Sequence, residues 1–254
     1  MMRRNPASDL CVYAENASMI CEYAESAIRS GLRSLVLSLP SSFSSDEFRA
    51  LRAKYAEHIL FLRAFEGERR VDEAGNCCDV LIGVPETLEL GGVILPFPKT
   101  ARDLLSAVRY TNGEMLTLWR ACYSAMTALP QKTGCDAVRL LDFLSLNTNG
   151  ALFDPRDKRY EQVAWRATEE LLKQDVVIEL CVSPCRGGVL PISNPDAALL
   201  RCIGEQSGRV ALSSRATSPK GLCLDFRSAL SQLRACGIGS IHVWQESGWA
   251  CLPL

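Results

Sequence analysis

Short runs of apolar residues alternate along this chain with longer segments in which apolar positions recur every three or four residues. The short runs are typical of buried strands, and the longer segments are typical of amphipathic helices. This alternation predicts an α/β protein with a largely parallel sheet. Strands are expected at 10–13, 35–39, 59–64, 80–84, 141–146, 176–182, 209–212 and 241–244.

Helix signals lie between most of these strands. Ser44 and Glu47 form a plausible capping box, Asp154-Pro155 has the residue types that begin helices, and Gly31 and Gly237 stand where helices end. Residues 85–99 are rich in Pro and Gly and are expected to form a loop. Helices are expected at 18–30, 44–55, 101–110, 114–129, 154–173, 195–203 and 226–235. About seven strand–helix units predict one distorted (β/α)7 TIM-like barrel, a single domain over 1–254.

Charge and hydropathy limit the partners of the chain. The formal net charge is -1, so the overall charge gives no support to binding of RNA or of an anionic membrane. No apolar run reaches the roughly 18 residues that a membrane span needs. We therefore expect no membrane association, and a protein is the expected partner.

The chain has 12 cysteines, and none of the close pairs has the spacing of a paired zinc site. We interpret them as reduced, mostly buried thiols. No signal peptide precedes the first expected strand, which favours an intracellular, reducing compartment. The cytoplasm is the first expectation and the mitochondrion is the alternative.

Histidine is scarce, with His58 and His242 alone. Multinuclear metallohydrolases usually need several imidazole ligands, which two isolated histidines do not supply. No serine or cysteine motif accompanies either histidine, so a nucleophilic triad is not expected.

Six segments, taken in order, resemble the PHP (polymerase and histidinol phosphatase) superfamily, in particular its histidinol-phosphate phosphatase branch. They are Asp9–Tyr13, Ser38–Pro40, Ala64–Glu66, Gly83–Glu86, Glu179–Arg186 and Ser214–Pro219. The resemblance runs over nearly the whole chain, and it implies a PHP-type barrel. In that family the same segments carry the ligands of a zinc, manganese or iron cluster that hydrolyses phosphate esters.

The resemblance also implies that most of these ligands have been replaced. Cys11 and Tyr13 stand where the family's first strand, which begins with the counterpart of Asp9, has two histidines. Glu66 matches the bridging glutamate. The other histidine, asparagine and aspartate ligands are replaced by Pro40, Glu86, Asn147, Cys181, Arg215 and Thr217.

This set of residues predicts a degenerate metal site, and no cofactor is expected. Pro40 cannot coordinate a metal through its side chain, and Arg215 would repel a dication. Cys11, Glu66 and Glu86 are the remaining candidates for a single zinc. Arg186 and Arg215, with Ser183, could bind a phosphate or another anion. Alternatively, the two arginines could pair with Glu66, Glu86 or Glu179 as a structural replacement for the metal.

Three functions are compatible with these residues. The first is a catalytically inactive PHP barrel that serves as a scaffold or interaction protein. The second is a residual metal-dependent phosphoesterase of the histidinol-phosphatase type. The third is an RNA-associated barrel like the ribonuclease P protein subunit, which Ile178–Pro184 and Ser213-Ser214 resemble.

Overall fold

Seven parallel strands form the centre of the described chain, in the order β1-β2-β3-β4-β7-β8-β10. The computed structural model describes residues 8–139, 152–154, 156–182, 193–245 and 248–254. The strands are β1 (Ser8–Tyr13), β2 (Ser34–Ser38), β3 (Leu60–Gly67), β4 (Val80–Gly83), β7 (Ala137–Val138), β8 (Val177–Val182) and β10 (Arg209–Ser213). Short β9 (Ser193–Asn194) pairs antiparallel with β8.

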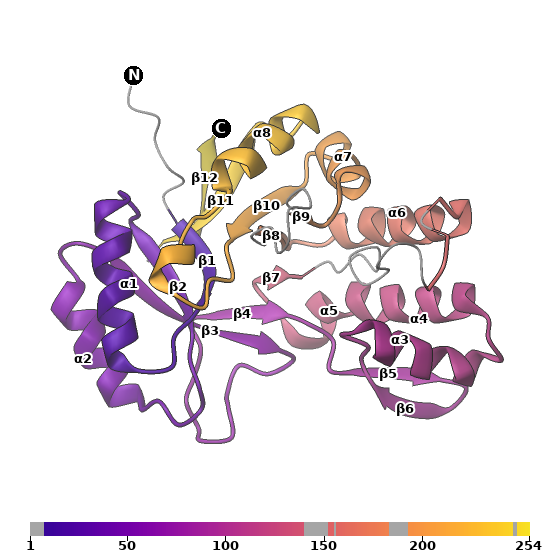
Figure 1. Cartoon of the computed structure of the whole chain (residues 1–254), viewed down its shortest axis with the longest axis horizontal. Coiled ribbons are helices and arrows are strands. Elements are labelled where there is room, and N and C mark those ends of the chain that lie inside the picture. The colour runs from indigo at the N-terminus through magenta and orange to yellow at the C-terminus, as the bar shows by residue number, and fades with distance from the viewer. Residues whose placement is uncertain (1–7, 140–151, 155, 183–192, 246–247) are drawn as a thin grey trace.

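The sheet curves into a nearly closed barrel because the segment after β10 returns to β1. The Arg215 backbone N–H donates to the Cys11 carbonyl at 2.9 Å, and the Tyr13 N–H donates to the Ala216 carbonyl at 2.8 Å. These bonds join the last parallel strand to the first. The predicted distorted (β/α)7 barrel is therefore confirmed, and Figure 1 labels its strands and helices.

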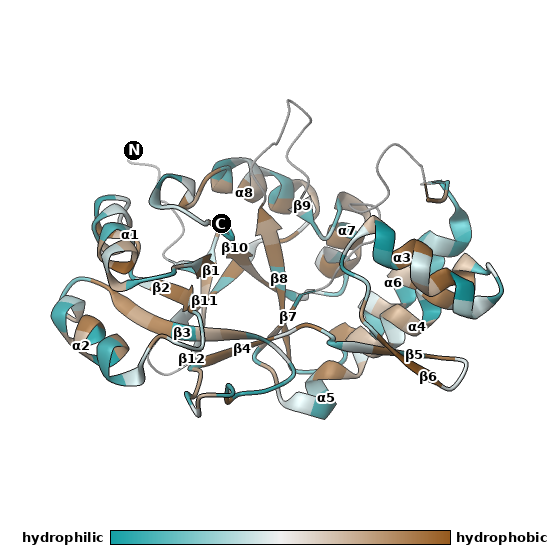
Figure 2. Ribbon diagram, turned by 60° about the horizontal axis from the view of Figure 1, so that its bottom comes forward, coloured by the Kyte–Doolittle hydropathy of each residue, from teal (hydrophilic) through white to brown (hydrophobic). Residues whose placement is uncertain are grey.

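Helices cover the outside of the barrel between successive strands. They are α1 (Ala17–Arg29), α2 (Ser45–Tyr55), α3 (Ala101–Ala107), α4 (Met115–Thr127), α5 (Leu129–Thr133), α6 (Lys158–Leu172), α7 (Ala197–Glu205) and α8 (Phe226–Ala235). The apolar residues of the helices pack in the core clusters together with residues of the strands. In Figure 2 the strands are mostly brown, whereas α1, α2 and α6 each carry both brown and teal residues. The hydrophobic core therefore lies between the barrel and this layer of helices.

Two hairpins add to the barrel. The β11–β12 hairpin (Ser240–Gln245 and Gly248–Pro253) lies at the amino ends of the strands. The Ser34 hydroxyl there donates to the Trp244 carbonyl at 2.8 Å, and the Trp249 indole donates to the Asp136 carbonyl at 3.2 Å. Trp244 and Trp249 pack edge to face on each other and lie against the apolar interior residues, so they cover that end of the barrel. The carboxyl end is therefore the end that is available for a functional site.

Several sequence predictions need correction. The expected loop at 85–99 contains a second hairpin, β5 (Thr87–Leu90) with β6 (Val93–Pro96), and β12 was not predicted. The helix expected from Asp154 begins at Lys158, because the Asp157 carboxylate caps it by accepting the Arg159 N–H. The strand expected at 141–146 lies outside the described residues, and β7 stands between β4 and β8. The expectation of one domain over 1–254 stays a prediction.

Candidate functional site

Charged side chains from several strands meet inside the barrel at its carboxyl end. Side chains of a strand alternate between its two faces, so Leu62, Ala64 and Glu66 share the inward face of β3. On β8, Glu179 follows the inward-facing Val177 by two residues, and Arg139 follows Ala137 of β7 in the same way. The barrel interior is apolar toward the amino ends of the strands, and the layer of side chains at their carboxyl ends is ionic.

The Arg139 guanidinium is the centre of this layer. It donates two hydrogen bonds to Glu179, from Nε at 2.6 Å and from Nη2 at 3.1 Å. Its Nη1 donates to Glu66 Oε2 at 2.5 Å. Only 4% of the Arg139 side chain is exposed, and Glu179 is fully buried. Burial opposes the charged form of Arg139, but the two carboxylates raise its pKa above the usual arginine value.

Glu66 is the second node of the cluster. Its Oε1 accepts the Tyr13 hydroxyl at 2.5 Å and the Cys11 thiol at 3.1 Å, while Oε2 faces Arg139. Burial by itself would raise the pKa of Glu66. The charge and hydrogen bond of Arg139, helped by Arg215 and Tyr13, instead lower this pKa to about 2. Glu66 is therefore ionised at neutral pH, and both of its oxygens are engaged.

Arg215 closes the cluster on the solvent side. Its Nη2 lies 3.8 Å from Glu66 Oε2 and donates to the Tyr13 hydroxyl, and its guanidinium lies 5.4 Å from the centre of the Tyr13 ring. The Arg215 backbone has φ of +49°, a left-handed conformation that is uncommon for non-glycine residues. The side chain is 35% exposed, so it joins the buried ion pairs to the surface.

The cysteines, the tyrosine and Asp9 around this cluster are held in their neutral or hydrogen-bonded forms. Burial raises the pKa of Cys181 to about 12, and burial together with Glu66 raises the pKa values of Cys11 and Tyr13. Asp9 is buried and accepts the backbone N–H groups of Ser214 at 2.8 Å and Cys223 at 3.4 Å. Burial raises the pKa of Asp9 to about 6. The Cys11 and Cys181 thiols and the Tyr13 hydroxyl are therefore protonated at neutral pH, so none of the three is an ionised nucleophile.

Other residues predicted for the site do not reach the cluster. Pro40 and Thr217 are exposed at the ends of their strands. Glu86 is exposed, and its Oε1 accepts the backbone N–H of Glu68 at 3.2 Å, so it does not converge with Cys11 and Glu66 on a zinc. Asn147, Ser183 and Arg186 lie outside the described residues, so their predicted roles stay predictions. His58 is exposed at the start of β3, and His242 lies on β11 in the hairpin at the opposite end of the barrel.

The described residues do not fit the zinc, manganese or iron cluster that the family resemblance implies. Among them, no group of three or more histidine, cysteine, aspartate or glutamate side chains is arranged to hold a metal ion. Both oxygens of Glu66 and both oxygens of Glu179 accept hydrogen bonds. A guanidinium lies between these carboxylates, and it would repel a dication. The two glutamates and two arginines also balance each other in formal charge.

A cleft of 510 Å³ lies beside Glu66 and Tyr13 at this end of the barrel. Its charged lining residues are Glu66, Arg69, Asp72, Glu73 and Glu86. Arg139 neutralises Glu66, but the other three carboxylates against the one guanidinium of Arg69 still give the described lining an acidic excess. A phosphate monoester carries up to two negative charges at neutral pH, so the cleft would repel it.

Arg139 was missed by the sequence analysis, although it is the centre of the cluster. No motif marks it, since it follows a strand of only two residues. The one available signal was an arginine directly after an apolar pair, in a barrel whose neighbouring strands carry inward glutamates. Glu179 had been named as an ion-pair partner for the arginines, and its partner in the structure is Arg139.

The fold and the site define a class: an α/β barrel of seven parallel strands with an ion-pair cluster at its carboxyl end. No family model matches the sequence, and no curated protein matches it. Among solved structures, the chain is similar to the "putative histidinol phosphatase hisK from Listeria monocytogenes", with a TM-score of 0.60 and 13% identity over 87% of this chain and 99% of that chain. At this level of identity the likeness shows a shared barrel fold alone.

A second solved structure with some likeness is a GH18 chitinase from Pseudoalteromonas aurantia. The identity is 14% over 80% of this chain and 66% of that chain, and the TM-score is 0.32. We draw no argument from a TM-score of this size. In the part of the chain that the structure describes, no helix has the length and hydropathy needed to span a membrane.

Proposed function

We propose that this chain is a PHP-like barrel without metal-dependent phosphoesterase activity, and that it acts as a scaffold or interaction protein. The observation that carries the proposal is the position of the Arg139 guanidinium between Glu66 and Glu179. The fixed positive charge of Arg139 takes the place of metal charge in holding these carboxylates. These ion pairs link β3, β8 and the residue after β7 at the carboxyl end of the barrel without a cofactor.

The chemistry of phosphate ester hydrolysis explains why this replacement is expected to remove catalysis. A metal ion lowers the pKa of a bound water and polarises the phosphoryl oxygen. A guanidinium cannot coordinate a water molecule as a metal ion does. Its pKa is so high that it stays protonated and cannot take a proton from water to form hydroxide. The donors of Arg139 are also already bound to two carboxylates. The acidic cleft next to the cluster adds a repulsion of the substrate.

A hydrolysis assay tests the catalytic part of this proposal. Wild-type protein and Glu66→Gln are incubated with p-nitrophenyl phosphate and with histidinol phosphate, each with added zinc, manganese or iron and with EDTA. Circular dichroism verifies that Glu66→Gln is folded. The expected result is the same background rate for both proteins under all conditions. Metal-dependent turnover in the wild type that Glu66→Gln abolishes would mean a working phosphoesterase and would contradict the proposal.

A further inference from the structure

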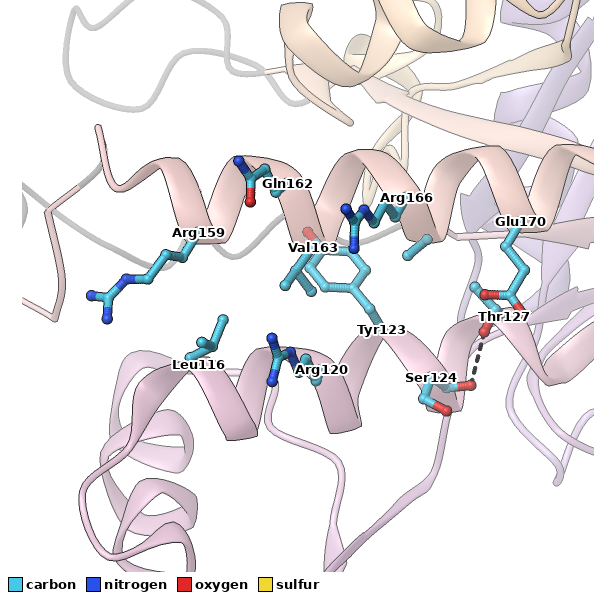
Figure 3. A pocket seen from close by; sticks show the side chains of 11 residues that line it. Leu116, Arg120, Tyr123, Ser124, Thr127, Arg159, Gln162, Val163, Arg166 and Glu170 are labelled. Carbon is cyan, nitrogen blue, oxygen red and sulfur yellow. Dashed lines mark hydrogen bonds between the residues drawn. The ribbon is translucent and has the colours of Figure 1, made fainter.

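A groove of 260 Å³ runs between α4 and α6, on the helical layer and away from the ion-pair cluster. Two parallel rows of side chains wall it, as Figure 3 shows. The rows follow helical spacing, so each presents one face of its helix to the groove. The row on α4 includes Leu116, Arg120 and Ser124, and the row on α6 includes Arg159, Gln162 and Arg166.

The floor of this groove holds the two helices in a fixed relation. Tyr123 of α4 and Tyr160 of α6 are both buried, and their hydroxyls are 3.0 Å apart in a hydrogen bond. Trp119 packs edge to face on the Tyr160 ring, with ring centres 5.1 Å apart. The walls of the groove are therefore preorganised, which lowers the entropic cost of binding a ligand.

The walls present an excess of positive charge. Arg120 reaches from α4 and Arg166 from α6 into the same gap. Both are exposed, and neither side chain has an ion pair or hydrogen bond with any residue in the described ranges. Arg159, at one end, is paired with Asp157 at 2.7 Å, and Glu170 lies at the other end. Since Asp157 neutralises Arg159, two unpaired guanidiniums face the single carboxylate of Glu170 within the groove lining.

We propose that this groove binds an acidic, extended segment of a partner protein. The inference rests on the interaction role proposed above, and it does not depend on the loss of catalysis. Guanidiniums bind carboxylates through paired hydrogen bonds, and two unpaired guanidiniums from facing helices can hold one acidic side chain between them. Such a contact also relieves the repulsion between Arg120 and Arg166.

The spacing of the arginines sets the pattern of the ligand. Arg159 and Arg166 are two helical turns apart, which is roughly 10 Å along the axis at 1.5 Å per residue. A chain extended as a polyproline II helix has three residues per turn and advances about 3.1 Å per residue, so acidic side chains at intervals of three residues share one face and lie about 9 Å apart. Glu170 repels an acid at the far end, which favours a basic or neutral residue there.

An acidic protein segment suits the groove better than RNA does. RNA binding usually shows a broad basic surface along the path of the backbone. Here the formal net charge of the chain is -1, and Glu170 lies at one end of a short groove. RNA is therefore the alternative ligand that the test must separate.

Fluorescence anisotropy at low ionic strength tests the proposal with the full-length chain. The probe is a short labelled Gly/Ser peptide with glutamate at every third position, compared with its glutamine counterpart and with a labelled uridine oligomer. The groove variant is Arg120→Gln/Arg166→Gln. The matched control is Arg227→Gln/Arg234→Gln, which removes two exposed arginines two turns apart on α8.

We expect the glutamate peptide to bind, and the groove variant to weaken its binding by at least about tenfold, as loss of charge-assisted hydrogen bonds would do. The control variant should change binding less than about twofold, because isolated exposed charges contribute little. The proposal is overturned if the peptide does not bind or if both variants weaken it equally. It is also overturned if the uridine oligomer alone binds through the groove. None of these outcomes bears on the hydrolysis assay.

Discussion

Replacing Arg139 by methionine should be one of the most destabilising single changes at the carboxyl end of the barrel. The substitution keeps a long, unbranched side chain but removes the guanidinium. Glu179 would then be a fully buried carboxylate without its partner, and Glu66 would lose its shortest ion pair. Burying an unpaired charge is much more costly than losing an exposed ion pair.

The expected loss can be estimated from the burial of the pair. Removing one partner of a buried pair costs about 3–5 kcal/mol of unfolding free energy. For a chain of this size each kcal/mol corresponds to a shift of roughly 2–4 °C in Tm, so we expect Tm to fall by roughly 6–20 °C. The double variant Arg139→Met/Glu179→Met removes both charges and should be more stable than Arg139→Met alone.

Urea unfolding followed by circular dichroism measures these differences at neutral pH. The control is Arg209→Met, because Arg209 pairs with Asp175, which is 96% exposed. That change should cost at most about 1 kcal/mol. If Arg139→Met costs no more than Arg209→Met, the ion-pair cluster does not stabilise the barrel and the reasoning is refuted.

Three further predictions concern other parts of the structure. Because the folded pKa of Asp9, about 6, lies above its ordinary value of 3.8, the stability it contributes is present below about pH 4 and is lost as pH rises through 6. The unfolding free energy should fall by up to roughly 3 kcal/mol over that window, as measured by urea unfolding at several pH values. Asp9→Asn should make the unfolding free energy depend less on pH. Tyr13→Phe removes the 2.5 Å hydrogen bond to Glu66, so the pKa of Glu66 should rise from about 2 and the acid-unfolding midpoint should move to higher pH; an unchanged midpoint would argue against this bond. Gly204→Ala should lower the unfolding free energy by about 1–3 kcal/mol, because a Cβ at this position of α7 would lie 2.1 Å from the Cys236 carbonyl oxygen at the end of α8. Gly239→Ala is the control, since its Cβ would meet nothing within 4 Å, and thermal unfolding should show almost no change for it.

The barrel strands could be predicted from the sequence because strands buried on both sides are continuous apolar runs. Val80–Gly83 and Val177–Val182 were expected within one residue of their observed bounds. The β5–β6 hairpin was missed because its Gly91-Gly92 turn was taken as part of a loop. Both glycines have positive φ, and a two-residue turn of this kind joins antiparallel strands.

The site was less predictable than the fold, because its contacts join residues far apart in the chain. Glu66 could be found from a motif, but Arg139 lies 73 residues after it and pairs with Glu179 a further 40 residues on. Local patterns carry no information on such pairs. An arginine–glutamate pairing was one of the two alternatives that the sequence left open for Arg215, and in the structure Arg215 Nη2 lies 3.8 Å from Glu66 Oε2.

Metal content of the purified protein tests the central claim most directly. Wild type and Glu66→Gln are incubated with zinc, manganese and iron, desalted, and analysed by mass spectrometry for metal per chain, with circular dichroism to verify folding. The account predicts far less than one equivalent of metal in both folded proteins, because Arg139 already neutralises the carboxylates. One or more tightly bound equivalents in the wild type, lost in Glu66→Gln, would contradict it.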